Sequence, residues 1–254
     1  MIRDRDALIG IIAGQRATLL ERALEDAIHW CPHPAASVGR AQRSDQYWYE
    51  LLPATKHLSE DDVREFFIIY KLWRWTKWNL SSLVTAIEQL RTQIIGSASG
   101  AISALGTQLQ KCQAEGSSPK QHTSAASKVA FYTHPNITFY IWDQYALRSA
   151  RFGDWVRSGS DSVPSSFYAA YADRHGRHAY SGFKASCTTR LTAERTKPDF
   201  GLTADAFRRY LKSTGGPLGE APADPGGFVE RRFLDKLMYQ EGRVLEDLEK
   251  SAST

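Results

Sequence analysis

Two residues in the middle of the chain have side chains suited to chemistry and a spacing that lets them act together. Lys128 lies in the small and apolar stretch Ser127-Lys128-Val129-Ala130-Phe131, and Asp143 ends the stretch Tyr140-Ile141-Trp142-Asp143. The lysine belongs to a predicted helix, and the aspartate stands at the start of the next one. Because the link between the two helices is short, we expect the amine and the carboxylate to face one another.

Each of these residues also has an ordinary structural interpretation, which the sequence leaves open. Most lysines in helices are exposed to solvent. Asp143 stands where a helix N-cap belongs, and such a cap contributes about 1 kcal/mol without any catalytic role. The two roles of Asp143 are compatible, because a capping carboxylate can still present an oxygen to a site.

Other clusters of chemically versatile residues lack the ligands that a metal site requires. His175 and His178 have a spacing that zinc sites use, but no further ligand stands nearby and the adjacent arginines disfavour a cation. Cys31-Pro32-His33 is too sparse for a metal site, and no paired-carboxylate motif of the nuclease type is present. The sequence therefore predicts no metal and no cofactor.

The composition predicts a folded, mildly basic protein without a membrane anchor. Hydrophobic residues make up 42% of the chain, and the formal net charge is +4. This small positive charge is compatible with binding a polyanion but is not typical of a dedicated nucleic-acid-binding protein. Positive charge is concentrated from Arg148 to Lys197, although a solvated face is the commoner explanation of such a bias. The three cysteines are far apart and no apolar run could span a bilayer, so we expect a cytoplasmic protein.

Apolar residues recur at helical spacing along most of the chain, which predicts an all-α protein. We expect the run Ile137 to Trp142 to be extended or a tight connection, and Gly215 to Gly227 to be a mobile loop. The small residues from Gly96 to Gly106 give no clear prediction. Helices are expected over residues 19–30, 59–79, 82–94, 124–132, 143–156, 165–174, 180–193, 203–212 and 227–249.

Polar residues at the starts of several predicted helices indicate how those helices are capped. Ser59 and Asp62 form a variant of the capping box, and their helix is expected to run to Asn79. Either residue of Ser81-Ser82 could cap the next helix, and Ser124 could cap the helix that carries the lysine. The charged run Glu230 to Lys236 is expected to form the solvated face of an amphipathic helix.

The stretch from Ser127 to Asp143, with His134-Pro135 between the two helices, resembles the 8-oxoguanine DNA glycosylase branch of the helix-hairpin-helix superfamily. It is closer still to bacterial proteins that share this fold. Two flanking stretches, Ile69-Tyr70-Lys71-Leu72-Trp73-Arg74 and Glu230-Arg231-Arg232-Phe233-Leu234-Asp235-Lys236-Leu237, extend the resemblance over roughly residues 60 to 240. It implies two lobes of helices flanking a cleft, in a single all-helical unit over residues 1–254 with an N-terminal extension (1–58) and a glycosylase-like core (59–250).

The resemblance implies a DNA N-glycosylase with lyase activity. Lys128 would be the nucleophile that attacks C1′ of the deoxyribose, and Asp143 would stabilise the positive charge that develops on the sugar as the base leaves. Only the neutral amine is nucleophilic, and an ordinary lysine pKa of about 10.4 leaves little of it at pH 7. Burial beside Val129 and Phe131 would lower that pKa.

The resemblance also implies partners and further site residues. Similar proteins occur in bacterial antiphage operons beside enzymes of deazaguanine chemistry, so we expect DNA with a modified purine or deazapurine base, in antiphage defence or DNA repair, and protein partners from the same operon. Trp142 or Trp73 would hold the flipped base, although core packing is the more usual role for Trp73. The expected nucleic-acid contacts are Lys120, His122, Ser124, Ser127, Arg148 and Arg151.

Two departures from the family pattern support an alternative function. The segment from Ser118 to Ser124 lacks the glycines of the family's phosphate-binding hairpin, and the link from Lys128 to Asp143 is shorter than in the repair enzymes. The alternative is a non-catalytic module that keeps the fold and binds nucleic acid, a nucleotide or a protein partner of a defence complex.

Overall fold

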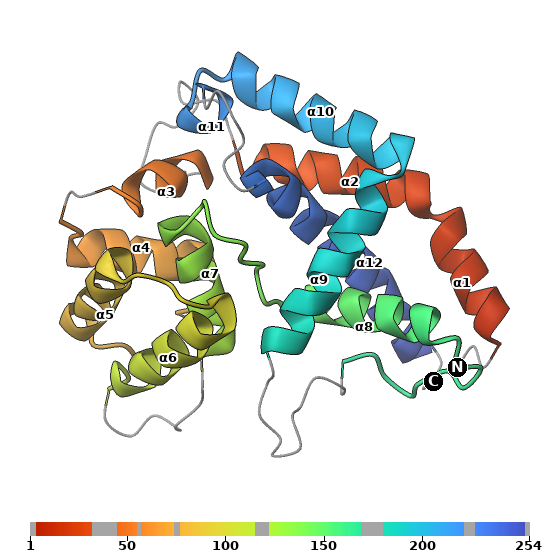
Figure 1. Ribbon diagram of the computed structural model, residues 1–254, viewed down its shortest axis with the longest axis horizontal. Helices are drawn as coiled ribbons and strands as arrows, with labels where there is room; N and C mark the ends of the chain where they lie inside the picture. Colours follow the sequence, from red (N-terminus) through yellow and green to blue (C-terminus); the bar gives the residue numbers. More distant parts are fainter. Residues whose placement is uncertain are drawn as a thin grey trace. The chain divides into compact units, whose positions relative to one another are not determined.

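The computed structural model describes residues 4–31, 45–54, 57–73, 77–114, 122–168, 180–220 and 227–251 (Figure 1). Within these ranges the regular secondary structure is α-helical, and the only β-type pairing is an isolated bridge between Trp78 and Gln113. The prediction of an all-α protein is confirmed. None of the helices in the described ranges is both long and apolar enough to span a bilayer.

The chain divides into two compact units, each built from segments that are distant in sequence. Unit 1 comprises Met1–Trp30, Trp142–Ser213 and Val229–Thr254, and unit 2 comprises Cys31–Ile141 and Thr214–Phe228. The predicted extension over residues 1–58 and core over 59–250 stay predictions. Each unit has its own buried interior, and we describe each separately.

In unit 1, α10 packs against α2 and α9, α8 packs against α9, and α1 packs against α2. One core cluster consists of Leu8 and Ile12 from α1, Phe152 and Trp155 from α8, and Leu245 from α12, together with Phe167. The helices of this unit are α1 (Arg5–Gly14), α2 (Arg16–His29), α8 (Gln144–Ser158), α9 (Tyr180–Arg195), α10 (Pro198–Ser213) and α12 (Phe228–Ser251), whose first residue belongs to unit 2.

A glycine allows α12 to lie directly against the start of α8. A Cβ atom built on Gly242 would lie 2.0 Å from the carbonyl oxygen of Tyr145. Because no side chain can occupy that space, any larger residue at position 242 would push the two helices apart.

In unit 2, α7 is the helix around which the others pack. It contacts α3, α5 and α6, and every residue from Ala125 to Thr133 is buried. A helix that is buried on all sides is rich in small and apolar residues, which is the composition of this one. The other helices of the unit are α3 (Asp45–Leu51), α4 (Glu60–Ile69), α5 (Leu80–Thr92), α6 (Ala98–Lys111) and α11 (Pro217–Glu220); α7 spans Thr123–Thr133.

The capping box at the start of α4 is confirmed, but the helix ends earlier than expected. The Asp62 backbone N–H donates to Ser59 Oγ at 3.1 Å, and the Ser59 backbone N–H donates to Asp62 Oδ2 at 3.2 Å. The helix stops at Ile69, and Lys71 adopts a left-handed conformation with φ 57°. This turn ends the helix ten residues before Asn79. Asn79 itself, and neither of the two serines, caps α5 by accepting from the Ser82 backbone N–H.

Two further stretches differ from the prediction, and one that the sequence left open is helical. Most of the stretch from Gly96 to Gly106 belongs to α6. Its small side chains permit close packing of this helix on α7. Residues 165–168 are not helical, since the Phe167 backbone N–H donates instead to the Glu249 carboxylate at 2.8 Å; the rest of that predicted helix lies outside the described residues. The expected loop contains α11.

The charged beginning of α12 is buried, so the expected solvated face is wrong. Arg231, Arg232, Asp235 and Lys236 are 1%, 4%, 9% and 5% exposed. Arg232 Nη1 lies 2.5 Å from Asp235 Oδ2. Lys236 Nζ lies 3.1 Å from Asp26 Oδ2 and 4.7 Å from the centre of the Trp30 ring. Opposite charges offset part of the cost of burying these groups, and sequence periodicity alone does not reveal such pairs.

Candidate functional site

Lys128 lies in the middle of α7 and is only 9% exposed. Its neighbours along the helix are small or apolar, with Ala125, Ala126, Val129 and Ala130 all buried. The interpretation of Lys128 as an ordinary exposed helix lysine is therefore wrong. A lysine in such a position is uncommon, because burial disfavours the charged ammonium.

The end of the Lys128 side chain is held by a hydroxyl from the same helix. Lys128 Nζ donates to Ser124 Oγ at 2.9 Å. Ser124 stands four residues earlier, so the two side chains share one face of α7. The Ser124 carbonyl in turn accepts from Ser127 Oγ at 2.9 Å, and Ser127 is fully buried. The structure thus brings together three of the predicted site residues.

The N-terminal end of α7 has no side-chain cap from its N-cap residue. Ser124, the expected cap, lies inside the helix, which begins at Thr123 with His122 in the N-cap position. The His122 ring lies 4.6 Å from the Trp78 ring and contacts the side-chain amide of Gln113. Thr123 Oγ1 is buried and has no hydrogen-bond partner. The first backbone N–H groups of α7 therefore have no side-chain cap from His122.

Asp143 is the N-cap of α8, as the sequence predicts. Its backbone is extended, and Oδ1 accepts from the Tyr145 backbone N–H at 2.8 Å. Burial first, and then the negative charge of Asp143, raise the pKa of Tyr239, which packs edge-on against Tyr145 with ring centres 4.9 Å apart. Asp143 belongs to unit 1 and Lys128 to unit 2.

The basic residues predicted to contact nucleic acid have different surroundings. Arg148 is 9% exposed and lies 3.2 Å from Glu246 and 3.3 Å from Glu249, with its guanidinium over the Tyr168 ring. Arg151 is half-buried and lines a cavity of about 460 Å³. Lys120 lies outside the described residues. The contacts of these side chains with nucleic acid stay predictions.

The two predicted base-pocket tryptophans also differ from one another. Trp142 is 6% exposed and packs edge-on against Phe183, with ring centres 5.1 Å apart. Trp73 is half-buried beyond the end of α4, and the Arg64 guanidinium lies 5.8 Å from its ring. Trp142 therefore contributes to the packing of unit 1, whereas Trp73 keeps part of its ring accessible.

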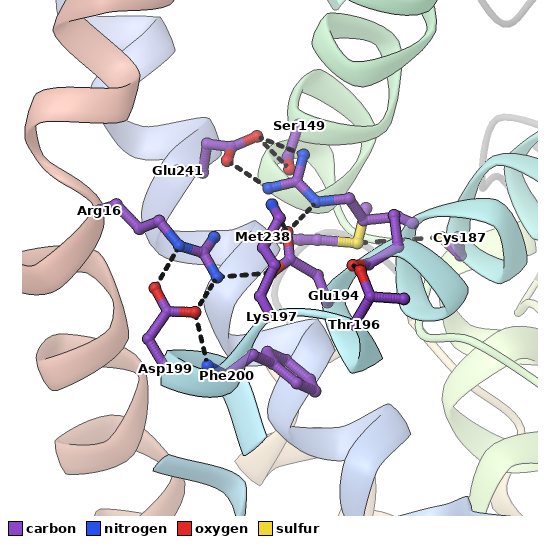
Figure 2. A network of polar contacts seen from close by, with 12 residues as sticks. Arg16, Ser149, Cys187, Glu194, Thr196, Lys197, Asp199, Phe200, Met238 and Glu241 are labelled. Atoms are coloured by element: carbon purple, nitrogen blue, oxygen red, sulfur yellow. Dashed lines mark hydrogen bonds and ion pairs between the residues drawn. The ribbon is translucent and has the colours of Figure 1, made fainter. Parts of the chain in front are cut away.

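A buried network of charges in unit 1 has no counterpart among the sequence predictions (Figure 2). Arg190 lies between two carboxylates: Nε donates to Glu194 at 2.8 Å and Nη2 to Glu241 at 2.8 Å. Glu241 also accepts from Ser149 Oγ at 2.8 Å. Arg16 Nη2 reaches Glu194 at 2.8 Å. The i,i+4 spacing of Arg190 and Glu194 predicts a pair, but it does not show that the pair is buried.

The network keeps the Glu194 carboxylate ionised. Burial alone would raise the pKa of Glu194, but the charge of Arg190 and hydrogen bonds from Arg16 and Lys197 outweigh it and lower that pKa. Glu194 is fully buried, so these cations are what make its charge tolerable. These pairs connect α2, α9 and α12. Because each charged group has a partner of opposite charge within the network, we interpret the network as structural.

Cysteine and metal chemistry have no visible basis in the described parts of the chain. Burial raises the pKa of the thiols of Cys112 and Cys187, which leaves them as unreactive thiols. No group of three or more His, Cys, Asp or Glu side chains in those parts is placed to hold a metal ion.

Comparisons with known proteins add no relative. No protein-family model matches the chain, and neither the curated proteins nor the solved structures contain a significant match.

Proposed function

We propose that the protein is a DNA N-glycosylase with lyase activity that removes a modified purine or deazapurine base, and that Lys128 supplies the reacting amine. The observation that carries this proposal is the burial of Lys128 in α7, with its Nζ held by Ser124 at 2.9 Å. A buried lysine costs stability, and residues that are kept at such a cost are often functional. The glycosylase-like fold and a role in repair or antiphage defence belong to the same proposal and rest on the sequence resemblance.

In the proposed reaction, the lone pair of neutral Lys128 forms a bond to C1′ of the deoxyribose. The N-glycosidic bond breaks, and its electron pair leaves with the base, which takes up a proton. Opening of the sugar then gives a Schiff base, from which strand cleavage follows by elimination. The proposed role of Asp143 is to stabilise the positive charge on the sugar while it also caps α8.

The N-terminal end of α7 supports a polyanionic substrate. Backbone N–H groups and the helix dipole make such an end favourable for a phosphate. His122 provides no side-chain cap there, and the Thr123 hydroxyl is buried without a partner. A DNA phosphate bound at this end would lie near Ser124, to which the Lys128 amine donates a hydrogen bond.

Base release and covalent trapping test the proposal directly. Wild-type protein is incubated with a panel of duplex and single-stranded DNAs that carry modified purines, deazapurines or abasic sites. Mass spectrometry detects released base, and borohydride reduces any Schiff base to a stable adduct. Lys128→Gln should abolish both signals, whereas Lys111→Gln, the same change at an exposed lysine of α6, should leave them intact. Equal and negligible release and trapping by wild type and Lys128→Gln over the whole panel would overturn the proposal.

The second candidate is a module that binds nucleic acid, a nucleotide or a protein without chemistry. The features that favour it are the departures from the family pattern, namely the segment from Ser118 to Ser124 without glycines and the short link from Lys128 to Asp143. The same panel separates the two candidates. Saturable binding of a modified DNA or nucleotide, with the base fully retained and Lys128→Gln binding as well as wild type, would establish the module.

A further inference from the structure

We propose that a cavity on unit 2 binds a small organic cation, an amine of the diamine or polyamine class with a short aliphatic chain. Helices α4 and α5 pack against one another (Figure 1), and the cavity lies where the segment that leads into α4 meets one face of α5. Its volume is about 670 Å³, within the range of roughly 300–1,000 Å³ that is usual for small-molecule sites. Lys128 is not among the residues that line it, so the proposal is independent of the proposed reaction.

The charged groups in the wall of the cavity favour a cation. Glu60 and Glu88 supply two carboxylates, and neither a lysine nor an arginine is among the described residues that line it. Arg91 pairs with Glu88, but its side chain is only 5% exposed and is not part of the wall. The positive end of the α4 dipole is offset by three acidic residues in the first turn of that helix. An ammonium group would therefore be attracted to the cavity, whereas an anion would be repelled.

The Glu88 carboxylate has one oxygen that is already used and one that is open to a ligand. Oε1 accepts from the Leu58 backbone N–H at 2.8 Å and from Arg91 Nη1 at 2.9 Å, and it lies 3.4 Å from His57 Nδ1. The carboxylate contacts of Glu88 with the described residues all go to Oε1, and the side chain is 25% exposed. Because these bonds fix the carboxylate, Oε2 can accept from an ammonium group with little further loss of side-chain entropy.

The remaining wall along α5 suits an amine that carries an aliphatic chain. Thr85 Oγ1 donates to the Ser81 carbonyl at 3.0 Å. Thr92 Oγ1 donates to the Gln89 carbonyl at 3.1 Å. Both hydroxyl protons are therefore used within the helix, and the two oxygens remain as acceptors for an ammonium group, which has N–H donors and no acceptor. Val84, which also lines the cavity, contributes apolar surface against which the chain can pack.

A titration followed by NMR tests the proposal on the full chain. Backbone amide spectra are recorded as cadaverine or spermidine is added. The neutral diol and the anionic dicarboxylate with the same aliphatic chain as cadaverine are the controls. We expect saturable shifts with both amines, centred on the amides of Leu58, Thr85 and Glu88, and none with the controls at the same concentrations.

Two substitutions assign the binding to this cavity. Glu88→Gln removes the negative charge but keeps a side-chain oxygen for the Leu58 N–H, and it should weaken binding about tenfold, because the ammonium group loses a charged acceptor. Thr85→Trp fills the cavity from an exposed position of α5 and should abolish binding. Its control is Thr107→Trp on α6, since Thr107 is also exposed and its hydroxyl also donates to the carbonyl of a serine one turn earlier; this variant should bind like the wild type. Thermal unfolding identifies any variant that fails to fold.

Several results would overturn the proposal. They are the absence of saturable shifts with either amine, equal binding of the neutral diol, or shifts that spread over exposed carboxylates of other helices. Binding by folded Thr85→Trp that equals binding by Thr107→Trp, or unchanged binding by folded Glu88→Gln, would also contradict it. Base release plays no part in these outcomes, because a protein that binds cadaverine in this cavity and releases no base would support the cation site and contradict the glycosylase.

Discussion

The two units bury charged side chains beside different described partners. In unit 1, Arg190 is enclosed by the carboxylates of Glu194 and Glu241 at 2.8 Å each. In unit 2, Lys128 is buried in an apolar helix, and its Nζ donates to the neutral hydroxyl of Ser124. The first arrangement places charges of opposite sign together, whereas the second includes a hydrogen bond from the amine to a neutral hydroxyl.

We interpret this difference as one between a structural role in unit 1 and the proposed reactive role of Lys128. A carboxylate beside a cation favours the charged form and thereby removes the lone pair that a nucleophile needs. A hydroxyl orients the amine and does not lock its proton in place to the same degree. We therefore expect substitutions in the unit 1 network to change stability, and substitutions around Lys128 to change reactivity.

The largest expected effect on stability comes from removing the central cation of the unit 1 network. Arg190→Met leaves the buried carboxylates of Glu194 and Glu241 without their shared partner, and breaking a buried pair in this way costs about 3–5 kcal/mol. Hydrogen exchange of α9 and α12, with urea unfolding, measures the loss. The exposed Lys212→Met on α10 is the control. A loss no greater than that of the control would show that the network does not stabilise unit 1.

Acid should weaken unit 1 by the same mechanism, with a smaller effect. Cations lower the pKa of Glu194 and Glu230 in the folded state, although burial opposes this. Because the folded pKa is below the unfolded value of about 4.3, the stabilisation is present above that pH and is lost as the pH falls through the folded value. Urea unfolding from pH 7 to pH 3 measures this loss. Glu194→Gln should flatten the acid dependence, and an unchanged profile in that variant would contradict the assignment.

Two substitutions of Asp143 separate its structural role from its proposed chemical one. Asp143→Ala removes the cap of α8 and should cost about 1 kcal/mol of stability. Asp143→Asn keeps a capping oxygen, so it should keep most of that stability and still reduce base release, because the negative charge is gone. Thermal unfolding and base release are measured on the same preparations. Full base release by Asp143→Asn would limit Asp143 to capping.

The smallest expected effect on stability is at Lys128. Lys128→Met replaces a buried amine with an apolar side chain of similar length, removes the hydrogen bond to Ser124, and should change the stability of unit 2 by no more than about 1 kcal/mol. Hydrogen exchange of α7 and urea unfolding report the result. A loss comparable to that of Arg190→Met would make Lys128 a structural residue and would remove the contrast between the two units.

Sequence periodicity predicts the helices of this protein better than it predicts their surroundings. The caps at Ser59 and Asp143 are local interactions between residues close in sequence, and both are confirmed. The burial of Arg231 and Lys236 depends on packing against distant segments such as the one that carries Asp26. No pattern along the chain contains that information, and the charged face of α12 is therefore misread.

At the candidate site, too, the sequence predicts local features but not the tertiary surroundings. The sequence identifies Lys128 as a residue of interest and places it on a helix of small residues. It does not show that this helix is buried on all sides, or that Ser124 lies inside the helix and holds the amine instead of capping it. Both facts depend on tertiary packing and on where the helix begins.

The central claim is that Lys128 is the reacting amine, and the position of the covalent adduct tests it most directly. Wild-type protein is reduced with borohydride in the presence of abasic DNA and, separately, of the modified DNA that gives most base release. Protease and nuclease digestion and tandem mass spectrometry then locate the attached sugar. We predict that the adduct is on Lys128 and that Lys236, which is 5% exposed and lies 3.1 Å from Asp26, carries none. An adduct on any other lysine, or none on Lys128 under conditions that release base, would contradict the account.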